Sequence, residues 1–268
     1  MAFDVETEKI VDALMRSGQT VAMTGAGIST ASGIQDFRDP GGPWRNYDPS
    51  KMTLEYFRKD PTYLWTIIHA FLAQRERAKP NRAHQALVEM EQMGMMDTII
   101  TQNLDGLHQM AGSTEVIEFY GGLRHCCCLQ CGNRIEFETI YTGNMGFEDK
   151  RDVSASIGPT PVPLCEQCGE AMMPDIPLYD TPLNVENIFA VEKRAISANM
   201  MLIIGTSLTM GPIGLLPNIT KRRGGIVAII NDSPTTFDEK AHFIATGKAE
   251  DILSEIVWKA GRRIVKLQ

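Results

Sequence analysis

Apolar residues recur at helical spacing in the first segment of the chain, VETEKIVDALMRSG (residues 5–18). This spacing predicts an amphipathic helix that begins after Asp4, a suitable cap, and ends at Gly18. The positions that carry the pattern are Val5, Ile10, Val11, Leu14 and Met15. A short apolar run in TVAMTGAGIST (20–30) follows, and it predicts a buried strand that leads into a glycine turn.

The same succession of helix and strand returns further along the chain. RAHQALVEMEQMG (82–94) predicts a helix that ends in glycine, and DTIITQN (97–103) predicts a strand with polar residues at its end. NMMLIIGTSL (199–208) and GGIVAIINDSP (224–234) have the same form as that strand. Strands of this kind, bounded by helices, indicate an α/β fold with a parallel sheet whose two faces are covered.

In such a sheet, ligands bind at the carboxyl ends of the strands. Four ends are therefore expected to converge: Gly25 to Ser29, Gln102 to Asp105, Gly205 to Ser207, and Asn231. The first, GAGISTASG (25–33), has glycines that let the backbone approach a pyrophosphate. Thr30 stands where the dinucleotide fingerprint has its third glycine, so the turn alone is weak evidence for a nucleotide.

Length and charge narrow the class of protein. The 268 residues suffice for one large domain and a smaller appendage. No apolar run approaches the roughly 18 residues that span a bilayer, so we expect a cytoplasmic protein without a membrane partner. A net charge of -7 argues against binding nucleic acid through the overall field and suits a basic peptide or protein partner.

All six cysteines lie in one short region, and four of them form two CxxC pairs. The pairs are Cys128 with Cys131 and Cys165 with Cys168, each followed by a glycine that permits a tight turn. We interpret them as a closed, structural zinc site of four thiolates, with redox pairs or disulfides as the alternative. Cys126 and Cys127 are left over, and we expect them to be bystanders.

Five ordered motifs resemble those of the sirtuin family of NAD-dependent protein lysine deacylases. They are GAGISTASGIQDFR (25–38), TQNLDGLH (101–108), the paired CxxC motifs, GTSL (205–208) and IIN (229–231), in that order, and the resemblance covers nearly the whole chain. The resemblance implies a Rossmann-like NAD-binding domain made of residues 1–40, 81–123 and 176–268. It also implies a helical module (41–80) and a zinc-ribbon module (124–175) inserted into that domain.

The resemblance further implies roles for individual residues. The NAD pyrophosphate would be held by Gly25, Ala26, Gly27, Ile28 and Ser29, and covered by a mobile loop that contains Asp36, Phe37 and Arg38. The nicotinamide ribose would be surrounded by Gln102, Asn103 and Asp105, with Asp105 binding the nicotinamide amide. The adenosine half would be held by Gly205, Thr206, Ser207 and Asn231.

In the family reaction, the acyl carbonyl oxygen displaces nicotinamide at the ribose carbon, and a histidine then acts as general base on the ribose hydroxyls. That histidine stands eight residues before the first zinc cysteine, where this chain has Tyr120. A tyrosine pKa of about 10, against about 6.5 for histidine, makes Tyr120 a poor proton acceptor near neutrality. We therefore expect severely weakened deacylation. His125 is a candidate substitute base, and His108 of TQNLDGLH is more consistent with a structural role.

A second departure lies in the expected substrate strand. The family usually has a sequence like DVVLFGE, whereas this chain has DIPLYDT (175–181). Pro177 removes an amide where an acyl-lysine peptide would add as a strand, and Asp180 replaces a glycine beside the peptide. Tyr120 alone is compatible with an introduced substitution, whereas the changes in 175–181 are harder to explain that way and keep natural divergence open; they are Pro177, Tyr179, Asp180 and Thr181. Two alternatives to a deacylase thus stay open: an ADP-ribosyltransferase or NAD hydrolase, and a non-enzymatic NAD-binding sensor.

Overall fold

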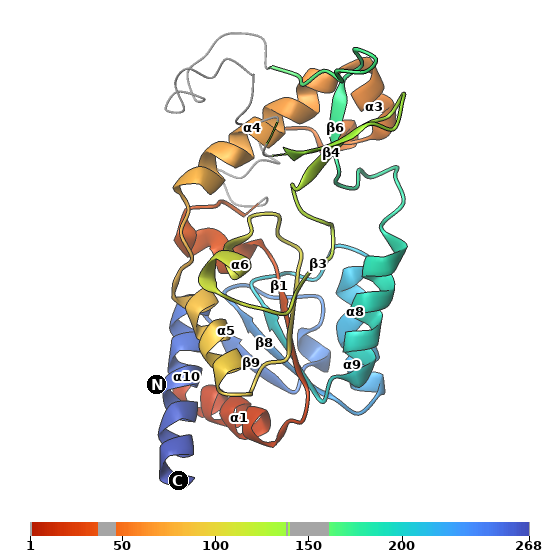
Figure 1. The fold of residues 1–268 in the computed structure, drawn as a ribbon. Coiled ribbons are helices and arrows are strands. Elements are labelled where there is room, and N and C mark those ends of the chain that lie inside the picture. The colour runs from red at the N-terminus through yellow and green to blue at the C-terminus, as the bar shows by residue number, and fades with distance from the viewer. Residues whose placement is uncertain (1, 37–46, 138, 140–160, 268) are drawn as a thin grey trace. The chain divides into compact units, whose positions relative to one another are not determined.

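The computed structural model describes residues 2–36, 47–137, 139 and 161–267 (Figure 1). The chain divides into two compact units. The first consists of residues 1–36, 79–119 and 185–268, and the second of residues 37–78 and 120–184. The division into three modules with the boundaries implied by the resemblance stays a prediction.

The first unit is built on a six-stranded parallel sheet with the strand order β3-β2-β1-β7-β8-β9 (Figure 1). This is the order of dinucleotide-binding sheets, and it confirms the predicted α/β fold with a parallel sheet. The strands are β1 (Thr20–Thr24), β2 (Thr98–Thr101), β3 (Val116–Glu118), β7 (Met200–Ile204), β8 (Ile226–Asn231) and β9 (Phe243–Thr246).

Helices cover both faces of this sheet (Figure 1). On one face pack α1 (Ala2–Arg16), α5 (Arg82–Gln92) and α10 (Ala249–Leu267), and on the other α8 (Val185–Ser197) and α9 (Leu216–Arg222). Every residue of β1 and β7 is buried, which is why these strands are continuous apolar runs rather than alternating ones. The first unit also contains α6 (Leu107–Ala111) and the 3₁₀ helices η1 (Ala26–Ser32), η3 (Ile213–Leu215) and η4 (Asp238–Lys240).

One local prediction needs correction. Helix α1 begins at Ala2, so Asp4 lies within the helix instead of capping its start. The glycine turn after β1 leads into η1, a 3₁₀ helix of seven residues. The chain enters its next α-helix of the first unit only at α5, where the Asn81 side chain accepts a hydrogen bond from the backbone N–H of Ala83.

The second unit combines helices with a small antiparallel sheet. It contains η2 (Pro49–Lys51), α3 (Leu54–Lys59), α4 (Pro61–Arg77) and a sheet of order β5-β4-β6, formed by Arg134–Glu136, His125–Cys128 and Met172–Pro174. Trp65 of α4 is buried and joins these parts, because its indole Nε1 donates a hydrogen bond to the Met172 carbonyl at 2.9 Å. Its ring also stacks on Phe137 with 6.1 Å between centroids.

No helix within the described ranges is both long and apolar enough to cross a membrane.

Candidate functional site

The glycine turn after β1 lies directly against the end of β7. The backbone N–H of Gly27 donates a 2.9 Å hydrogen bond to the carbonyl of Gly205. A Cβ on Gly25 would lie 2.7 Å from the Thr206 Cβ, and one on Gly27 would lie 2.9 Å from the Gly205 Cα. Gly205 itself has φ of 60°, and a Cβ there would collide with the amide nitrogen of Ile28. The approach of these two strand ends therefore requires glycine at all three positions.

A buried polar cluster follows the same turn. The Ser29 hydroxyl donates to Asp105 Oδ2 at 2.7 Å, and Asn103 Nδ2 donates to the Gly25 carbonyl at 3.1 Å and to Ser29 Oγ at 3.2 Å. The second Asp105 oxygen accepts the backbone N–H of Leu107 at 2.9 Å. Ser29, Asn103 and Asp105 come from the ends of two strands distant in sequence, and the structure brings them together as predicted.

The other predicted strand-end residues make hydrogen bonds at the ends of their own strands. Gln102 Nε2 donates to Thr206 Oγ1 at 3.0 Å, which links the end of β2 to the end of β7. Asn231 is buried at the end of β8, where its Nδ2 donates to the Ser233 carbonyl at 2.7 Å. Asp36 is described, whereas Phe37 and Arg38 lie outside the described residues.

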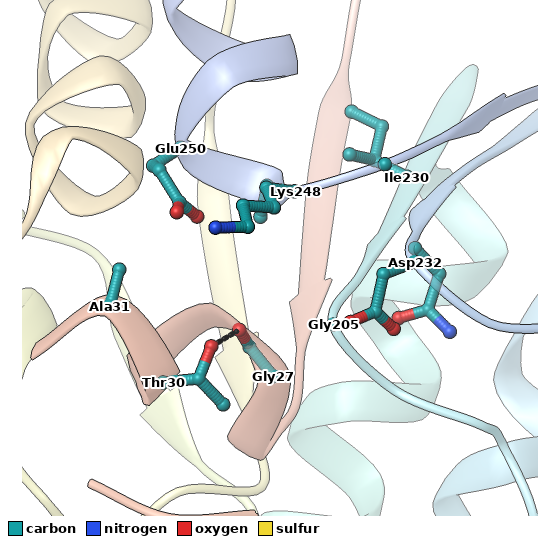
Figure 2. Close-up of a pocket in the computed structure, with 11 residues that line it drawn as sticks. Gly27, Thr30, Ala31, Gly205, Ile230, Asp232, Lys248 and Glu250 are labelled. Atoms are coloured by element: carbon teal, nitrogen blue, oxygen red, sulfur yellow. Dashed lines mark hydrogen bonds between the residues drawn. The ribbon is translucent and has the colours of Figure 1, made fainter. Parts of the chain in front are cut away.

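A cavity of about 250 Å³ opens at the ends of β1, β7, β8 and β9. Gly27, Gly205 and Asn231 line it, so three of the four predicted strand ends border one cavity. Figure 2 shows Lys248 and Glu250 reaching over it from the segment where α10 begins. Sequence reasoning missed these two residues. The signal was Gly247 directly after the short run FIAT (243–246), the same arrangement as at the other strand ends.

Two buried histidines lie beneath the polar cluster. His108 Nε2 is 2.9 Å from Thr24 Oγ1, and its ring centroid is 4.9 Å from that of His84. Burial lowers the pKa of His84 to about 4, and burial together with the neighbouring His84 lowers the pKa of His108 to about 3. Both rings are neutral at physiological pH, in agreement with a structural role for His108.

Tyr120 stands at the expected base position. It is the residue at which the chain passes from the first unit, which includes Phe119, into the second segment of the second unit. Its side chain is half-buried. Burial, and then the neighbouring Tyr179, raise the pKa of Tyr120 to about 12. The phenol is therefore protonated throughout the physiological range, and it can donate a hydrogen bond but not take up a proton. His125 lies away from this position in the sequence and contacts Arg134, whose Nη2 is 3.3 Å from His125 Nδ1.

Several backbone amides of the segment after β6, residues 175–181, are already hydrogen-bonded within the protein. The N–H of Ile176 donates to the Pro174 carbonyl, that of Leu178 to Thr181 Oγ1 at 2.7 Å, and that of Tyr179 to the Met52 carbonyl at 2.9 Å. Pro177 has no N–H to offer.

Asp180 has a structural task in the same segment. Its carboxylate accepts the backbone N–H of Leu54 at 2.6 Å and that of Glu55 at 3.2 Å, at the start of α3. The N–H of Leu54 and then that of Glu55 lower the pKa of Asp180, so the side chain is an anionic helix cap.

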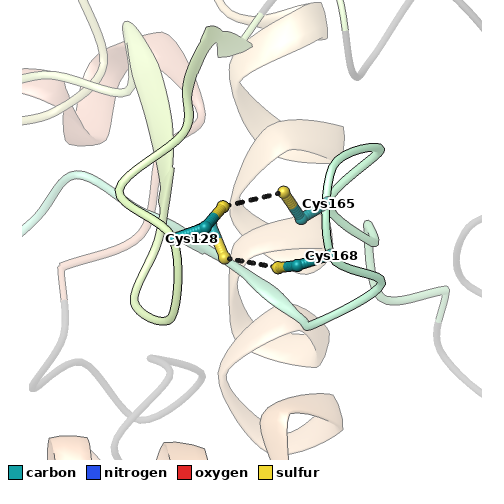
Figure 3. Close-up of side chains that lie close together, drawn as sticks. Cys128, Cys165 and Cys168 are labelled. Atoms are coloured by element: carbon teal, nitrogen blue, oxygen red, sulfur yellow. Dashed lines mark hydrogen bonds between the residues drawn. The ribbon is translucent and has the colours of Figure 1, made fainter.

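The four paired cysteines form one cluster (Figure 3). Their Sγ atoms all lie within 4.8 Å of one another, with 3.4 Å between Cys128 and Cys168 and 3.5 Å between Cys131 and Cys165. Tetrahedral zinc with Zn–S bonds of about 2.3 Å needs sulfurs about 3.8 Å apart, so the cluster fits the ion. The N–H of Gly132 bonds to the Cys128 carbonyl and that of Gly169 to the Cys165 carbonyl, so both turns are built alike.

Cys126 and Cys127 precede Cys128 in strand β4 but do not belong to the four-cysteine cluster. Cys126 is fully buried and Cys127 half-buried, and both are held in register by the neighbouring strands β5 and β6. Neither belongs to the group of described side chains whose spacing suits a metal ion.

The fold and site define a protein with a dinucleotide-type parallel sheet, glycine-bordered strand ends and a four-cysteine module. The family model described as Sir2 family matches residues 25–212, and the chain belongs to this family. The chain is 41% identical over 253 residues to an NAD-dependent protein deacetylase of Sulfurisphaera tokodaii, covering 94% of this chain and 95% of that one. It is 35% identical over 254 residues to an NAD-dependent protein deacylase of Pyrococcus furiosus, covering 94% and 97%.

Solved structures agree with this assignment. A chain from a study of the mechanism and regulation of Sir2 enzymes has a TM-score of 0.86 at 32% identity, covering 97% of this chain and 99% of that one. A Sir2 with a deacetylated p53 peptide and 3'-O-acetyl ADP-ribose has a TM-score of 0.85 at 30% identity, covering 96% and 99%. The sirtuin resemblance read from the sequence is thus confirmed.

Proposed function

We propose that this chain is an NAD-dependent protein lysine deacylase in which the deacylation step is slowed because tyrosine occupies the general-base position. The observation that carries the proposal is the arrangement of the first unit. The close-packed glycines 25, 27 and 205 and the Ser29, Asn103 and Asp105 cluster lie at the ends of adjoining strands, in a chain of the Sir2 family.

The glycine turn suits a pyrophosphate because it presents backbone without side chains to the cavity. We assign Gly25, Ala26, Gly27, Ile28 and Ser29 to the pyrophosphate, and Gly205, Thr206, Ser207 and Asn231 to the adenosine half. Asp36, Phe37 and Arg38 are assigned to the covering loop. Lys248 adds an ammonium group at the cavity, which complements a phosphate charge.

When bound, NAD supplies the ribose carbon at which the acyl oxygen displaces nicotinamide. Gln102 and Asn103 would orient the ribose, and Asp105 would accept the N–H of the nicotinamide amide. Ser29 fixes the Asp105 carboxylate through its 2.7 Å hydrogen bond, so this acceptor is positioned before a ligand arrives. These groups serve the first step, the loss of nicotinamide.

The second step needs a group that removes a proton from a ribose hydroxyl, and Tyr120 occupies that position in the sequence. A phenol with a pKa of about 12 keeps its own proton and acts as a donor instead. We therefore propose that nicotinamide release is faster than deacylation and is the main activity of this chain. Zinc held by Cys128, Cys131, Cys165 and Cys168 has a structural role, since four thiolates leave no open position.

Two features favour a second candidate function: the tyrosine at the general-base position and the segment 175–181. Several amides of this segment are already hydrogen-bonded and Pro177 has none, so the segment has few donors for an acylated peptide. This suits an NAD hydrolase or ADP-ribosyltransferase, or an NAD-binding sensor. A basic peptide substrate, a cytoplasmic location and the absence of nucleic-acid and membrane partners stay predictions.

Mass spectrometry of the products distinguishes these functions after incubation with NAD and an acetylated peptide. Acetylated ADP-ribose with free lysine supports the deacylase. Free ADP-ribose or an ADP-ribosylated protein supports the second candidate, and unchanged NAD with measurable binding supports the sensor.

A further inference from the structure

Three tyrosines of the second unit form a row of ring contacts with Tyr63 in the middle. Tyr47 precedes η2, Tyr56 lies on α3 and Tyr63 on α4. The rings of Tyr56 and Tyr63 are 5.4 Å apart between centroids at 70°, and those of Tyr47 and Tyr63 are 6.2 Å apart at 89°. Both pairs thus meet edge to face, an arrangement that leaves ring faces available for other contacts.

The position of Tyr63 is fixed by the backbone of Asp48. Its hydroxyl accepts the Asp48 N–H and also donates to the Asp48 carbonyl. Asp60 and Pro61 start α4 just before Tyr63, which sets the direction of this ring. The cluster is therefore held by helix starts and main-chain bonds rather than by the rings alone.

The cluster already holds an ammonium group. Lys51 Nζ lies 5.4 Å from the centroid of Tyr56 and 5.3 Å from that of Tyr63, within the range of cation–π attraction. Asp48 adds negative charge: hydrogen bonds from Ser50, and then the charge of Lys51, lower the pKa of its carboxyl group. Aromatic faces beside a carboxylate are the chemistry that recognises substituted ammonium ions.

We propose that Tyr56, Tyr63 and Asp48, with Tyr47 packed against Tyr63, form a cation cage for a methylated ammonium group, such as a methylated lysine side chain, and that Lys51 is its built-in competitor. Lys51 is half-buried at the end of η2, and none of the ion pairs among the described residues includes it. Its flexible stem can move the ammonium out to water at little cost.

A methylated ammonium is the better occupant for a physical reason. The Lys51 ammonium is compact and strongly hydrated, so part of the attraction to the rings is offset by lost water. Methyl groups spread the charge and replace hydrogen-bond donors, so less hydration is lost on entry. The cage would thus recognise a lysine other than the acylated one, and it does not depend on Tyr120 or on NAD.

The test uses tetramethylammonium as the probe and NMR of tyrosine-labelled full-length protein as the readout. Lys51→Gln keeps the stem and removes the competing charge, while Lys59→Gln removes an exposed charge that pairs with Glu55 outside the cage. We expect Lys51→Gln to bind the probe at least about threefold more tightly than the wild type, and Lys59→Gln to match the wild type.

Two further measurements separate a cage from a simple packing cluster. Adding Tyr56→Leu to Lys51→Gln should abolish probe binding, whereas Tyr56→Phe, which keeps the ring and the fold, should retain it. Neopentyl alcohol, a neutral molecule of similar shape, should not bind. Lys51→Gln without any gain in binding, or neopentyl alcohol binding as well as tetramethylammonium, would overturn the proposal and leave Lys51 as a packing residue of this turn.

Discussion

The backbone N–H of Tyr179 donates a 2.9 Å hydrogen bond to the carbonyl of Met52, which removes this amide from any exchange with a peptide. The neighbouring amide of Leu178 is engaged by Thr181, and Pro177 has none. A peptide that adds as a strand gains affinity from main-chain hydrogen bonds, and this segment has few donors to give.

The predicted consequence is a weak dependence on peptide length. The KM for nicotinamide release with a ten-residue acetyl-lysine peptide should lie within about tenfold of that with capped acetyl-lysine alone. Both are measured from initial rates at saturating NAD. A peptide KM lower by about a hundredfold or more would contradict this prediction, since it requires about 2.7 kcal/mol or more from flanking residues.

Gly205 should be irreplaceable because its φ is 60° and a Cβ would collide with Ile28. Gly224 is a matched control, since its φ is 85° but a Cβ there would have no atom within 4 Å. We expect Gly224→Ala to cost about 1 kcal/mol of unfolding free energy and Gly205→Ala about 3 kcal/mol or more, with weaker NAD binding. Urea unfolding and NAD titration measure both effects, and equal losses in the two variants would rule out this explanation.

The buried histidines predict acid sensitivity. The pKa values of His84 and His108 are about 4 and about 3 in the folded state, below the ordinary value of 6.5. The unfolded chain therefore binds protons first, and the native state loses stability as pH falls below 6.5, until the folded values are passed. Each histidine contributes at most about 1.4 kcal/mol per pH unit in this window. Urea midpoints between pH 7.5 and 5 should fall in the wild type and fall less steeply in His84→Gln, and parallel slopes would count against the assignment.

Zinc binding should depend on Cys131 and not on Cys127. Cys131 belongs to the cluster whose sulfurs lie within 4.8 Å of one another, whereas Cys127 lies outside it. We expect wild type and Cys127→Ser to carry a zinc ion that elemental analysis detects, and Cys131→Ser to lose it together with several kcal/mol of stability. Chelation should lower the melting temperature of the first two proteins only, and retained zinc in Cys131→Ser would show that the ligand set is wrong.

The strand ends were predictable because their signal is local. A buried parallel strand reads as a continuous apolar run, and glycine or polar residues mark where it ends, as at Gly25, Gln102 and Gly205. Strand β9 was not predicted because only one of its four residues is buried. Lys248 and Glu250, which follow this strand and line the cavity, were missed for the same reason.

Contacts between distant segments could not be read from the sequence. Pro177 signals a missing amide by itself, but the bond from Tyr179 to Met52 joins residues 127 positions apart along the chain. The sequence showed Asp180 only as a departure from the family pattern, and its contact with the start of α3 at Leu54 could not be read from it. Tyr56 and Tyr63, which lie against Lys51, and Tyr47, which packs on Tyr63, likewise come from three segments whose mutual placement depends on tertiary packing.

The central claim, that Tyr120 cannot serve as the base, is tested most directly by the single-turnover rate of deacetylation in Tyr120→His and Tyr120→Phe. With a pKa of about 12, the wild-type phenol stays protonated, so its loss in Tyr120→Phe should leave the slow rate nearly unchanged. Tyr120→His should accelerate deacetylation by about 10² to 10⁴, since an imidazole can take the ribose proton near neutrality. A Tyr120→Phe variant far slower than the wild type, with no gain in Tyr120→His, would contradict the account.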